Sequence, residues 1–340
     1  MVYMNRVNRR KILWGGAIII AIGLLIWVFS SGHSFTIGSS SSGETVKKPS
    51  SIAGLNCDTA QRRPVAVMLE SDPEARPLSG IGQADMVVEM PVTPNDVTRF
   101  MAIYQCQTPK EIGAIRSARQ DFIPLAAGFD TIYAHWGGEH GALAELDSHV
   151  MDDINALQFD GTVFYRKTTI APPHNGFSNL DLLFQQAKVF YYSLTKDFVG
   201  YPHTDALPAK NISNVATTVT LDYLSPYNVS WAYDQNKNIY ARTRGGEPEI
   251  DKNTNQQVTA SVIAVMDTTS HILTAGDQYI VVATTGQGPA EIYQAGIKIT
   301  GTWKKDPSKL DSKLFFYDSS GNEIKFTPGQ IWIEVNPTWQ

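Results

Sequence analysis

The stretch Glu111–Gly138, which reads EIGAIRSARQDFIPLAAGFDTIYAHWGG, places arginine, histidine and glycine at the ends of apolar segments that we expect to be buried. Its β-branched and aromatic run Thr131–His135 predicts a strand. Proline is tolerated in the first turn of a helix but not deep inside one, so Pro124 predicts a helix that is capped by Asp121. Strand, glycine pair and a further helix then follow in an order that suits an anion, because a helix start offers free N–H groups.

The segments around this stretch predict a mixed N-terminal domain. Apolar runs, turn residues and one capped helical pattern alternate there. Strands are expected at residues 65–69, 86–92, 98–105 and 162–166, and a helix at residues 180–192.

From about Thr217 onward the pattern becomes strand-like throughout, with turn residues between the runs and one long run at residues 291–303. The sequence therefore predicts a mixed α/β domain at residues 57–205. A β-rich antiparallel domain is expected at residues 206–340.

The N-terminal end predicts a membrane anchor. Residues 1–11 carry four cations, and the run Ile12–Phe29 contains no charged residue. Its eighteen residues would span about 27 Å as a helix, close to the thickness of the hydrocarbon core and longer than the apolar part of most signal peptides. We therefore expect a single-pass, uncleaved anchor in the cell membrane, with residues 1–11 in the cytoplasm and the folded domains outside it; a cleaved signal peptide is the alternative.

Residues 30–56 are rich in serine and glycine and predict a flexible linker. The whole chain has 28 Lys and Arg against 33 Asp and Glu, and four of those cations precede the anchor, so the remainder has a net charge of −9. Nucleic acid is therefore not an expected partner, since binding it requires a basic surface.

Two cysteines, Cys57 and Cys106, lie in the part expected outside the cytoplasm, where a disulfide is permitted. Cys57 precedes one predicted strand and Cys106 follows another, so adjacent strands would bring them together. We predict a disulfide between them, with two buried thiols as the alternative.

Arg116 and Arg119 flank Ser117 just ahead of the predicted helix start and are candidates for an anion clamp, because guanidinium groups bind carboxylate or phosphate through two parallel hydrogen bonds. The alternative is a purely structural role. In that case the two arginines would pair with Glu89, Glu111 or Asp130.

His135 ends a predicted buried strand beside Gly137 and Gly138, with Glu139 and His140 just beyond. This cluster could serve acid–base chemistry, and a hydrogen-bonded structural histidine is the alternative. The histidine spacing matches no zinc motif and the glycine spacing no dinucleotide fingerprint, so neither a metal nor a cofactor is predicted.

A second group of candidates lies in and before the loop Pro-Pro-His-Asn-Gly. Tyr165 and Arg166 end a short predicted strand, and His174 and Asn175 lie in the loop itself. Rigidly held loops often carry binding residues, although an exposed turn is the alternative. If the strands before His135 and His174 are neighbours, both histidines would line one cleft with the arginines.

Three functions stay open at this point. We favour binding of an anionic cell-envelope ligand or partner; the alternatives are an envelope hydrolase that uses His135 or His174 with a carboxylate, and a structural partner-binding protein. No nucleophile motif supports covalent catalysis, so whether the protein is an enzyme is left undecided. The expected ligand-binding residues are Arg116, Arg119, His135, Gly137, Gly138, Tyr165, Arg166, His174 and Asn175.

Several of these motifs together resemble a known family. They are RSAR at 116–119, HWGG at 135–138, FYR at 164–166, PHN at 173–175, RPVAVMLE and EARPLSGIGQAD near the start, and GIKITGTWKK and PGQIWIEV near the end. The chain is similar over residues 60–335 to the YerB-type family of bacterial envelope lipoproteins, which carries a domain of unknown function. The resemblance implies an envelope address and assigns no catalytic residue. Relatives typically carry a lipidated cysteine after the signal, whereas no cysteine precedes Cys57 here, so the apolar run would itself be the anchor.

Overall fold

The computed structural model describes residues 48–50, 52–195, 198–204, 216–274 and 278–340. The predicted anchor at residues 12–29 and most of the predicted linker lie outside the described residues. None of the helices in the described part is long and apolar enough to cross a membrane.

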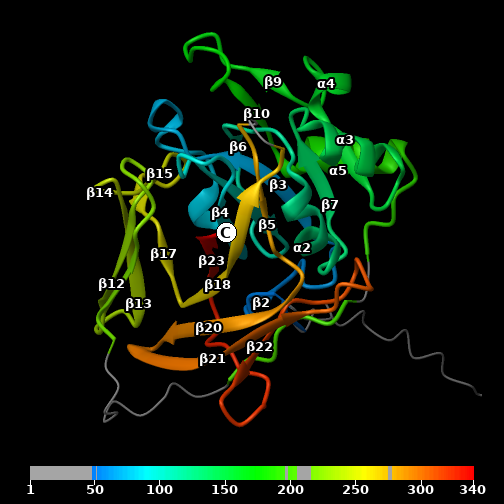
Figure 1. Cartoon of the computed structure of the whole chain (residues 1–340). Helices are drawn as coiled ribbons and strands as arrows, with labels where there is room; N and C mark the ends of the chain where they lie inside the picture. The colour runs from blue at the N-terminus through cyan, green and yellow to red at the C-terminus, as the bar shows by residue number, and fades with distance from the viewer. Residues whose placement is uncertain (1–47, 51, 196–197, 205–215, 275–277) are drawn as a thin grey trace, which may run out of the picture. The chain divides into compact units, whose positions relative to one another are not determined.

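One large sheet runs through the folded part (Figure 1). Within the described residues it has 11 strands, and β19 (Ile280–Val282) pairs with β18 beside the main path. In spatial order the other ten are β22 (Phe315–Asp318), β21 (Ile297–Lys305), β20 (Gly286–Gln294), β18 (Val262–Ile272), β23 (Ile331–Trp339), β4 (Met86–Pro91), β5 (Thr98–Tyr104), β3 (Val65–Glu70), β7 (Ile132–His135) and β8 (Asp153–Asn155).

Strand β23 joins the N-terminal and C-terminal parts of the chain in this sheet. It pairs in parallel with β18 on one side, Ile333 opposite Ala264, and in parallel with β4 on the other, Ile333 opposite Val88. The expectation of a purely antiparallel C-terminal part is therefore wrong. The reason is that the last strand is apolar on both faces and is buried between two neighbours, as strands of parallel sheets usually are.

Smaller sheets complete the strand structure, and their members are mostly short. One contains β11 (Thr218–Leu221), β12 (Val229–Asp234), β13 (Ile239–Arg244), β14 (Glu247–Pro248) and β17 (Thr259–Ala260). The others are β6 (Ile112–Gly113) with β10 (Gly176–Ser178) and β9 (Tyr165–Arg166), β1 (Lys48–Pro49) with β2 (Asn56–Cys57), and β15 (Ile250–Asp251) with β16 (Gln256–Gln257).

All helices of the described residues precede β11, which confirms a mixed N-terminal part followed by a mostly β C-terminal part. They are the short 3-10 helices η1 (Pro73–Ala75), η2 (Ile81–Gln83) and η3 (Gln120–Phe122), and the α-helices α2 (Ile123–Ala127), α3 (His140–Asp147), α4 (Ala156–Phe159) and α5 (Leu180–Val189).

The helix predicted to be capped by Asp121 forms differently. Helix α2 begins at Ile123, with Pro124 in its first turn as expected. The carboxylate of Asp121 does not cap it and accepts a hydrogen bond from the backbone N–H of Val282 at 2.9 Å. A tertiary contact with strand β19 has therefore replaced the local capping contact.

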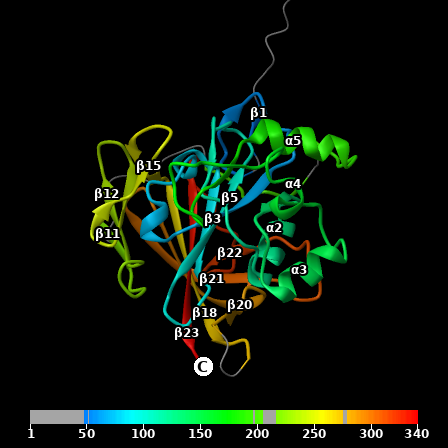
Figure 2. The ribbon, with the colours of Figure 1, turned by 90° about the horizontal axis from the view of Figure 1, so that it is seen from above.

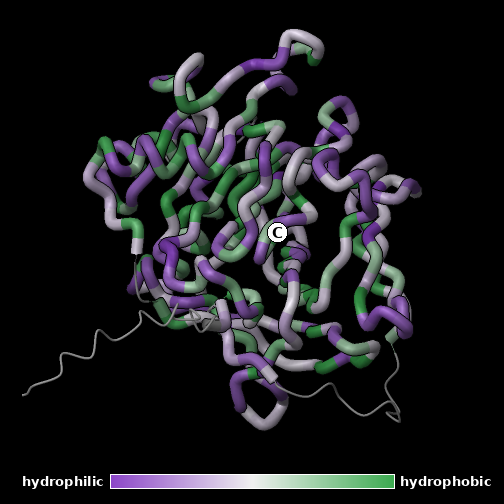
Figure 3. Tube along the Cα trace, turned by 180° about the vertical axis from the view of Figure 1, so that it is seen from behind, coloured by the Kyte–Doolittle hydropathy of each residue, from purple (hydrophilic) through white to green (hydrophobic). Residues whose placement is uncertain are grey.

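Side chains alternate between the two faces of the large sheet, so each central strand contributes to two apolar clusters. Phe100 and Val67 lie on one face, here called the Phe100 face. Residues of α5 and of the five-stranded sheet formed by β11–β14 and β17 pack there too. Met101 and Met68 lie on the other, the Met101 face, with residues of α2 and α3. Figure 2 shows α2 and α3 on one side of the central strands and β11 and β12 on the other. Apolar residues gather along the strands inside the fold (Figure 3).

A buried ion network joins the five-stranded sheet to the large one on the Phe100 face. Arg242 of β13 is fully buried and contacts the carboxylates of Glu89, Glu249 and Glu334. Arg244 contacts Glu89 and Glu249. The network therefore links strands β4, β13 and β23, which are far apart in the sequence.

The predicted disulfide is confirmed. Cys57 and Cys106 are bonded, with an S–S distance of 2.03 Å and their Cα atoms 5.7 Å apart. The antiparallel pairing of β3 with β5, Val65 opposite Tyr104, brings the two cysteines together as expected.

The linker was predicted to extend to residue 56, but the described structure folds residues of that segment. Strand β1 pairs with β2, Lys48 opposite Cys57. Ile52 and Ala53 are fully buried, and the Ser50 hydroxyl donates a hydrogen bond to the Gln105 side chain at 2.7 Å. The composition of residues 30–56 concealed a short apolar segment that packs against the body of the fold.

Candidate functional site

Strands β3 and β5 place an acid and an arginine side by side at one end of the sheet. Glu70 is the last residue of β3 and lies directly opposite Arg99 in the antiparallel pairing, so both side chains project from the Met101 face. Glu70 is fully buried and Arg99 is 4% exposed. Charged groups this deeply buried require partners or a function, because removing them from water is costly.

Two backbone contacts bring the loop containing His174 to the same place. The N–H of Glu70 donates to the carbonyl of Ala114 at 3.0 Å, and the N–H of Ile115 donates to the carbonyl of Gly176 at 2.8 Å. The segment that ends at Arg116 therefore lies between the end of β3 and the loop before β10. As a result, Arg116 Nε lies 3.2 Å and His174 Nδ1 3.0 Å from the same oxygen, Oε1 of Glu70.

Asp72, two residues after β3, extends this group toward the C-terminal part of the chain. The hydroxyl of Tyr227 donates a hydrogen bond to Asp72 Oδ1, and Arg99 Nη1 lies 4.0 Å from Asp72 Oδ2. The side chains of Asp72, Arg116 and His174 are 19%, 22% and 18% exposed. The group is therefore open to solvent on the side formed by these three residues, while Glu70 and Arg99 form its buried base.

Two arginines in this region have N–H groups without acceptors. Within the described residues, Nε and Nη1 of Arg99 and Nε of Arg119 are buried and make no hydrogen bond. Arg119 is 9% exposed; its Nη1 donates to the carbonyl of Ala118 at 2.9 Å, and its guanidinium lies 4.8 Å from the ring centre of Tyr279. We call Arg99, Arg116 and Arg119 the arginine cluster.

The pKa shifts agree with a crowded, partly dehydrated group of charges. Burial lowers the pKa of Arg99 to about 10, and the positive charges of Arg119 and Arg116 act in the same direction. Burial raises the pKa of Glu70 to about 7, with Asp72 adding to the rise and Arg116 and Arg99 opposing it. Arg99 thus remains cationic at neutral pH, and the three arginines lie close enough to one another to repel.

The acids that were considered as structural partners of Arg116 and Arg119 have other partners. Glu89 contacts Arg242 and Arg244, as described above. Glu111 pairs with Lys167 at 2.5 Å. Asp130 pairs with Arg63 at 3.0 Å. The structural alternative is therefore wrong for these three acids.

The acid that contacts Arg116 is Glu70, and both Glu70 and Arg99 were missed by the sequence reasoning. The available signal was a charged residue at the end of each of two strands that are otherwise apolar, VAVMLE and TRFMAIY. A charge within a run that reads as buried is informative, because an unpaired charge there would be strongly destabilising.

Arg166 and Asn175 lie next to His174, and their side chains are hydrogen-bonded to one another. Arg166 Nη1 donates to Asn175 Oδ1 at 3.1 Å and its Nε to Asp160 at 2.8 Å, while its guanidinium lies 4.1 Å from the ring centre of Trp136. These contacts hold the loop on either side of His174. Arg166 and Asn175 therefore position the loop in this structure.

Tyr165 is also engaged elsewhere. Its hydroxyl donates a hydrogen bond to Glu111 Oε2 at 2.9 Å, next to the contact between Glu111 and Lys167. The ring of Tyr165 stacks on Phe177 of β10, with ring centres 6.3 Å apart. These contacts thus stabilise the three-stranded sheet of β6, β10 and β9, which carries the loop.

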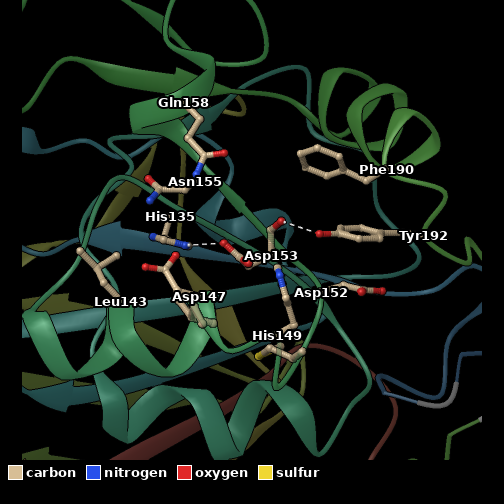
Figure 4. A pocket seen from close by; sticks show the side chains of 12 residues that line it. His135, Leu143, Asp147, His149, Asp152, Asp153, Asn155, Gln158, Phe190 and Tyr192 are labelled. Atoms are coloured by element: carbon tan, nitrogen blue, oxygen red, sulfur yellow. Dashed lines mark hydrogen bonds and ion pairs between the residues drawn. The ribbon is translucent and has the colours of Figure 1, made fainter.

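His135 lies in a separate cavity (Figure 4). Its Nδ1 is 2.7 Å from the carbonyl oxygen of Gly137, and its Nε2 is 3.1 Å from Asp153 Oδ2. The cavity has a volume of about 460 Å³, and Asp147, Asp152, Asp153 and Tyr192 are among its lining residues, which do not include His174 or the arginine cluster. The structure therefore does not bring the two histidines into one cleft.

Two backbone donors at the glycine pair and the start of α3 are bonded to side chains of the protein itself. Gly137 N–H donates to the Asn155 side chain at 3.1 Å, and the carboxylate of Glu139 caps α3 by accepting from Gly141 N–H. Gly137 has a φ of 62°, a conformation that favours glycine, and Gly138 bridges to Ala118. The two glycines shape the turn between β7 and α3. At the start of α3 lies the carboxylate of Glu139, where an anionic ligand was expected.

Comparison with known proteins gives a consistent match over both parts of the chain. The family described as "Protein of unknown function (DUF3048) N-terminal domain" matches residues 52–193, and its C-terminal domain matches residues 219–333. "Putative lipoprotein YerB" of Bacillus subtilis (strain 168) is 32% identical over 302 residues, which cover 86% of this chain and 88% of the relative. The crystal structure of the YerB protein from Bacillus subtilis matches with a TM-score of 0.76 at 30% identity, covering 86% of this chain and 97% of that one.

Proposed function

The chain belongs to the YerB-like family of unknown function, and from the geometry of its arginine cluster we propose that it binds an anionic ligand of the cell envelope. The observation that carries this proposal is that Arg99 and Arg119 are buried with N–H donors that have no acceptor in the described structure. The third arginine of the cluster, Arg116, has a side chain that is 22% exposed to solvent.

The unsatisfied donors of Arg99 and Arg119 favour an anion at this place. A buried donor without an acceptor costs about 1–3 kcal/mol, and more when it is charged. Phosphate or carboxylate oxygens would satisfy several guanidinium N–H groups at once through charge-assisted hydrogen bonds. An anion would also relieve the mutual repulsion of the three arginines, which Glu70 and Asp72 only partly balance.

Two observations support a location outside the cytoplasm. The disulfide between Cys57 and Cys106 is typical of an oxidising compartment. The relative from Bacillus subtilis carries the name of a lipoprotein. In this proposal the apolar run at residues 12–29 is the single-pass anchor, with the folded part on the outer side.

Binding of small anions to variants of the arginine cluster tests the function. Glycerol phosphate and succinate serve as phosphate and carboxylate probes in isothermal titration calorimetry. Arg116→Ala is expected to weaken binding at least 10-fold, since a hydrogen bond to a charged group contributes about 1.5–3 kcal/mol. Arg99→Lys and Arg119→Lys keep the charge but lose the planar fork, and each is expected to weaken binding less than Arg116→Ala.

Lys298→Ala is the matched control, because it removes a surface cation that pairs with Glu291 on strand β20. Its affinity for both probes should equal that of the unmodified protein. Unchanged affinity in Arg116→Ala, with the fold intact by circular dichroism, would contradict anion binding at the arginine cluster.

A hydrolase is a second candidate, because a histidine and a carboxylate lie within hydrogen-bond distance in a cavity. His135 Nε2 and Asp153 Oδ2 are 3.1 Å apart and border the 460 Å³ cavity of Figure 4. Each ring nitrogen of His135 faces an acceptor, the Gly137 carbonyl or Asp153, so in this candidate the 19% exposed Asp153 would be the general base on a water molecule and His135 would orient it. Hydrolysis of p-nitrophenyl acetate or p-nitrophenyl phosphate that falls about 100-fold in Asp153→Asn would support it; turnover equal to the buffer rate would exclude it for these substrates.

A further inference from the structure

Three potential metal ligands meet at the edge of the arginine cluster. One ligand atom from each of Glu70, Asp72 and His174 lies within 4.8 Å of the other two. Glu70 and Asp72 come from the end of strand β3, and His174 comes from the loop before β10, more than a hundred residues later. The structure therefore assembles a set of ligands that no local sequence motif contains.

Their hydrogen bonding sets these ligands apart from an ordinary ion pair. Both carboxylate oxygens of Glu70 and Nδ1 of His174 are buried and make no hydrogen bond among the described residues, although Glu70 Oε1 and His174 Nδ1 are only 3.0 Å apart. Ligand atoms at about 2.0–2.2 Å from one metal ion, at roughly right angles, lie about 3 Å apart. The two atoms thus have the spacing of neighbouring ligands of a shared ion without the geometry of a hydrogen bond.

From this arrangement we propose that Glu70, Asp72 and His174 bind a divalent transition metal ion, Mn²⁺ or Zn²⁺. The proposal rests on the proposed function, because the metal and the arginine cluster would hold the same anion. Two carboxylates and one imidazole are ligands for such ions, whereas Ca²⁺ and Mg²⁺ prefer oxygen alone. The hydrogen bond from Tyr227 to Asp72 is the kind of outer contact that orients a metal-binding carboxylate.

The balance of charge explains why metal and anion would bind together. Arg116 Nε lies 3.2 Å from Glu70 Oε1 and would therefore compete with a metal for that oxygen. A metal on Glu70 and Asp72 neutralises the carboxylates and releases Arg116. The arginine cluster is then left with an excess of positive charge, which a phosphate group bound to both the metal and the arginines would balance.

Metal titration of the full chain in detergent tests the site directly. Calorimetry with MnCl₂ and with ZnCl₂ is expected to give one site per chain, weakened at least 10-fold in the nearly isosteric Glu70→Gln and His174→Asn, with CaCl₂ binding more weakly than either. Glu291→Gln is the control for Glu70→Gln, since Glu291 also pairs with a cation and accepts from a tyrosine hydroxyl. The exposed His271, changed to Asn, is the control for His174. Absence of binding, or equal binding in all four variants, would overturn the metal site.

The coupling between metal and anion separates this inference from the proposed function. Thermodynamic linkage requires Mn²⁺ and glycerol phosphate to strengthen one another by the same factor, here expected to be at least 5-fold. If glycerol phosphate binds through Arg116 and is unaffected by Mn²⁺, the joint binding of metal and anion is overturned and anion binding stands. If neither probe binds, both are overturned.

Discussion

Replacing Arg242 by methionine tests how the C-terminal part is fixed to the large sheet. Arg242 is fully buried and contacts the carboxylates of Glu89, Glu249 and Glu334. Its guanidinium also lies 4.0 Å from the ring centre of Trp332. Methionine keeps much of the apolar volume and removes the charge, so the variant isolates the electrostatic role.

The expected loss of stability follows from what the variant leaves behind. Of the two arginines that pair with these three buried carboxylates, Arg244 would remain, and it contacts Glu89 and Glu249 but not Glu334. Removing one member of a buried ion pair destabilises by about 3–5 kcal/mol, because the partner remains buried without its counter-charge. We expect Arg242→Met to lose this amount of unfolding free energy at pH 8, and less at pH 5, where carboxylates can take up protons.

Urea denaturation followed by circular dichroism at pH 8 and pH 5 measures both quantities. Lys298→Ala serves as the comparison, since an exposed ion pair contributes at most about 1 kcal/mol. A loss below about 1 kcal/mol in Arg242→Met at pH 8 would contradict the electrostatic role of Arg242. It would mean that apolar packing alone holds the five-stranded sheet against strands β4 and β23.

Two further predictions concern stability. Burial raises the pKa of Glu334 to about 7 from an ordinary value of 4.5, although Arg242 opposes the rise. The protonated Glu334 carboxyl group therefore contributes fully to stability below about pH 4.5, and this contribution is lost as the pH rises through 7. Glu334→Gln cannot titrate and should lose less unfolding free energy between pH 5 and pH 8, whereas an equal loss would assign the dependence to other groups. Cys57→Ser with Cys106→Ser opens a loop of 49 residues and should cost about 2–4 kcal/mol; a denaturation midpoint that does not change would contradict a stabilising disulfide.

The central strands could be predicted because their burial produces a recognisable pattern in the local sequence. Runs predicted at residues 65–69, 86–92 and 98–105 form β3, β4 and β5 with boundaries that differ by about one residue. Burial on both faces produces unbroken apolar runs, which composition reveals directly. The partners of each strand could not be predicted in the same way. Nothing local to β23 indicates that it pairs in parallel with β4.

One predicted strand is a hairpin for an equally local reason. Residues 291–303 read as a single run, but β20 ends at Gln294 and β21 begins at Ile297. The turn between them is Ala295–Gly296, and both residues have positive φ angles. A single glycine next to alanine in a strand-like run was too weak a turn signal to divide it.

The candidate site was predicted in part. Arg116 and His174 were both predicted, and the structure brings them to the same oxygen of Glu70. Glu70 and Arg99 were missed, since their contact depends on the register between β3 and β5, which is a property of the folded sheet. His135 was grouped with His174 on the assumption of neighbouring strands, and it lies in a different cavity.

The most direct test of the central claim is a crystal structure grown with glycerol phosphate and MnCl₂, with anomalous data collected at the manganese edge. In that crystal we expect phosphate oxygens at about 2.7–3.2 Å from N–H groups of Arg99 and Arg119. We also expect an anomalous peak between Glu70, Asp72 and His174, with Arg116 moved from Glu70 to the anion. An arginine cluster without an anion, with Arg116 still on Glu70 and the phosphate bound elsewhere, would contradict anion binding at this cluster.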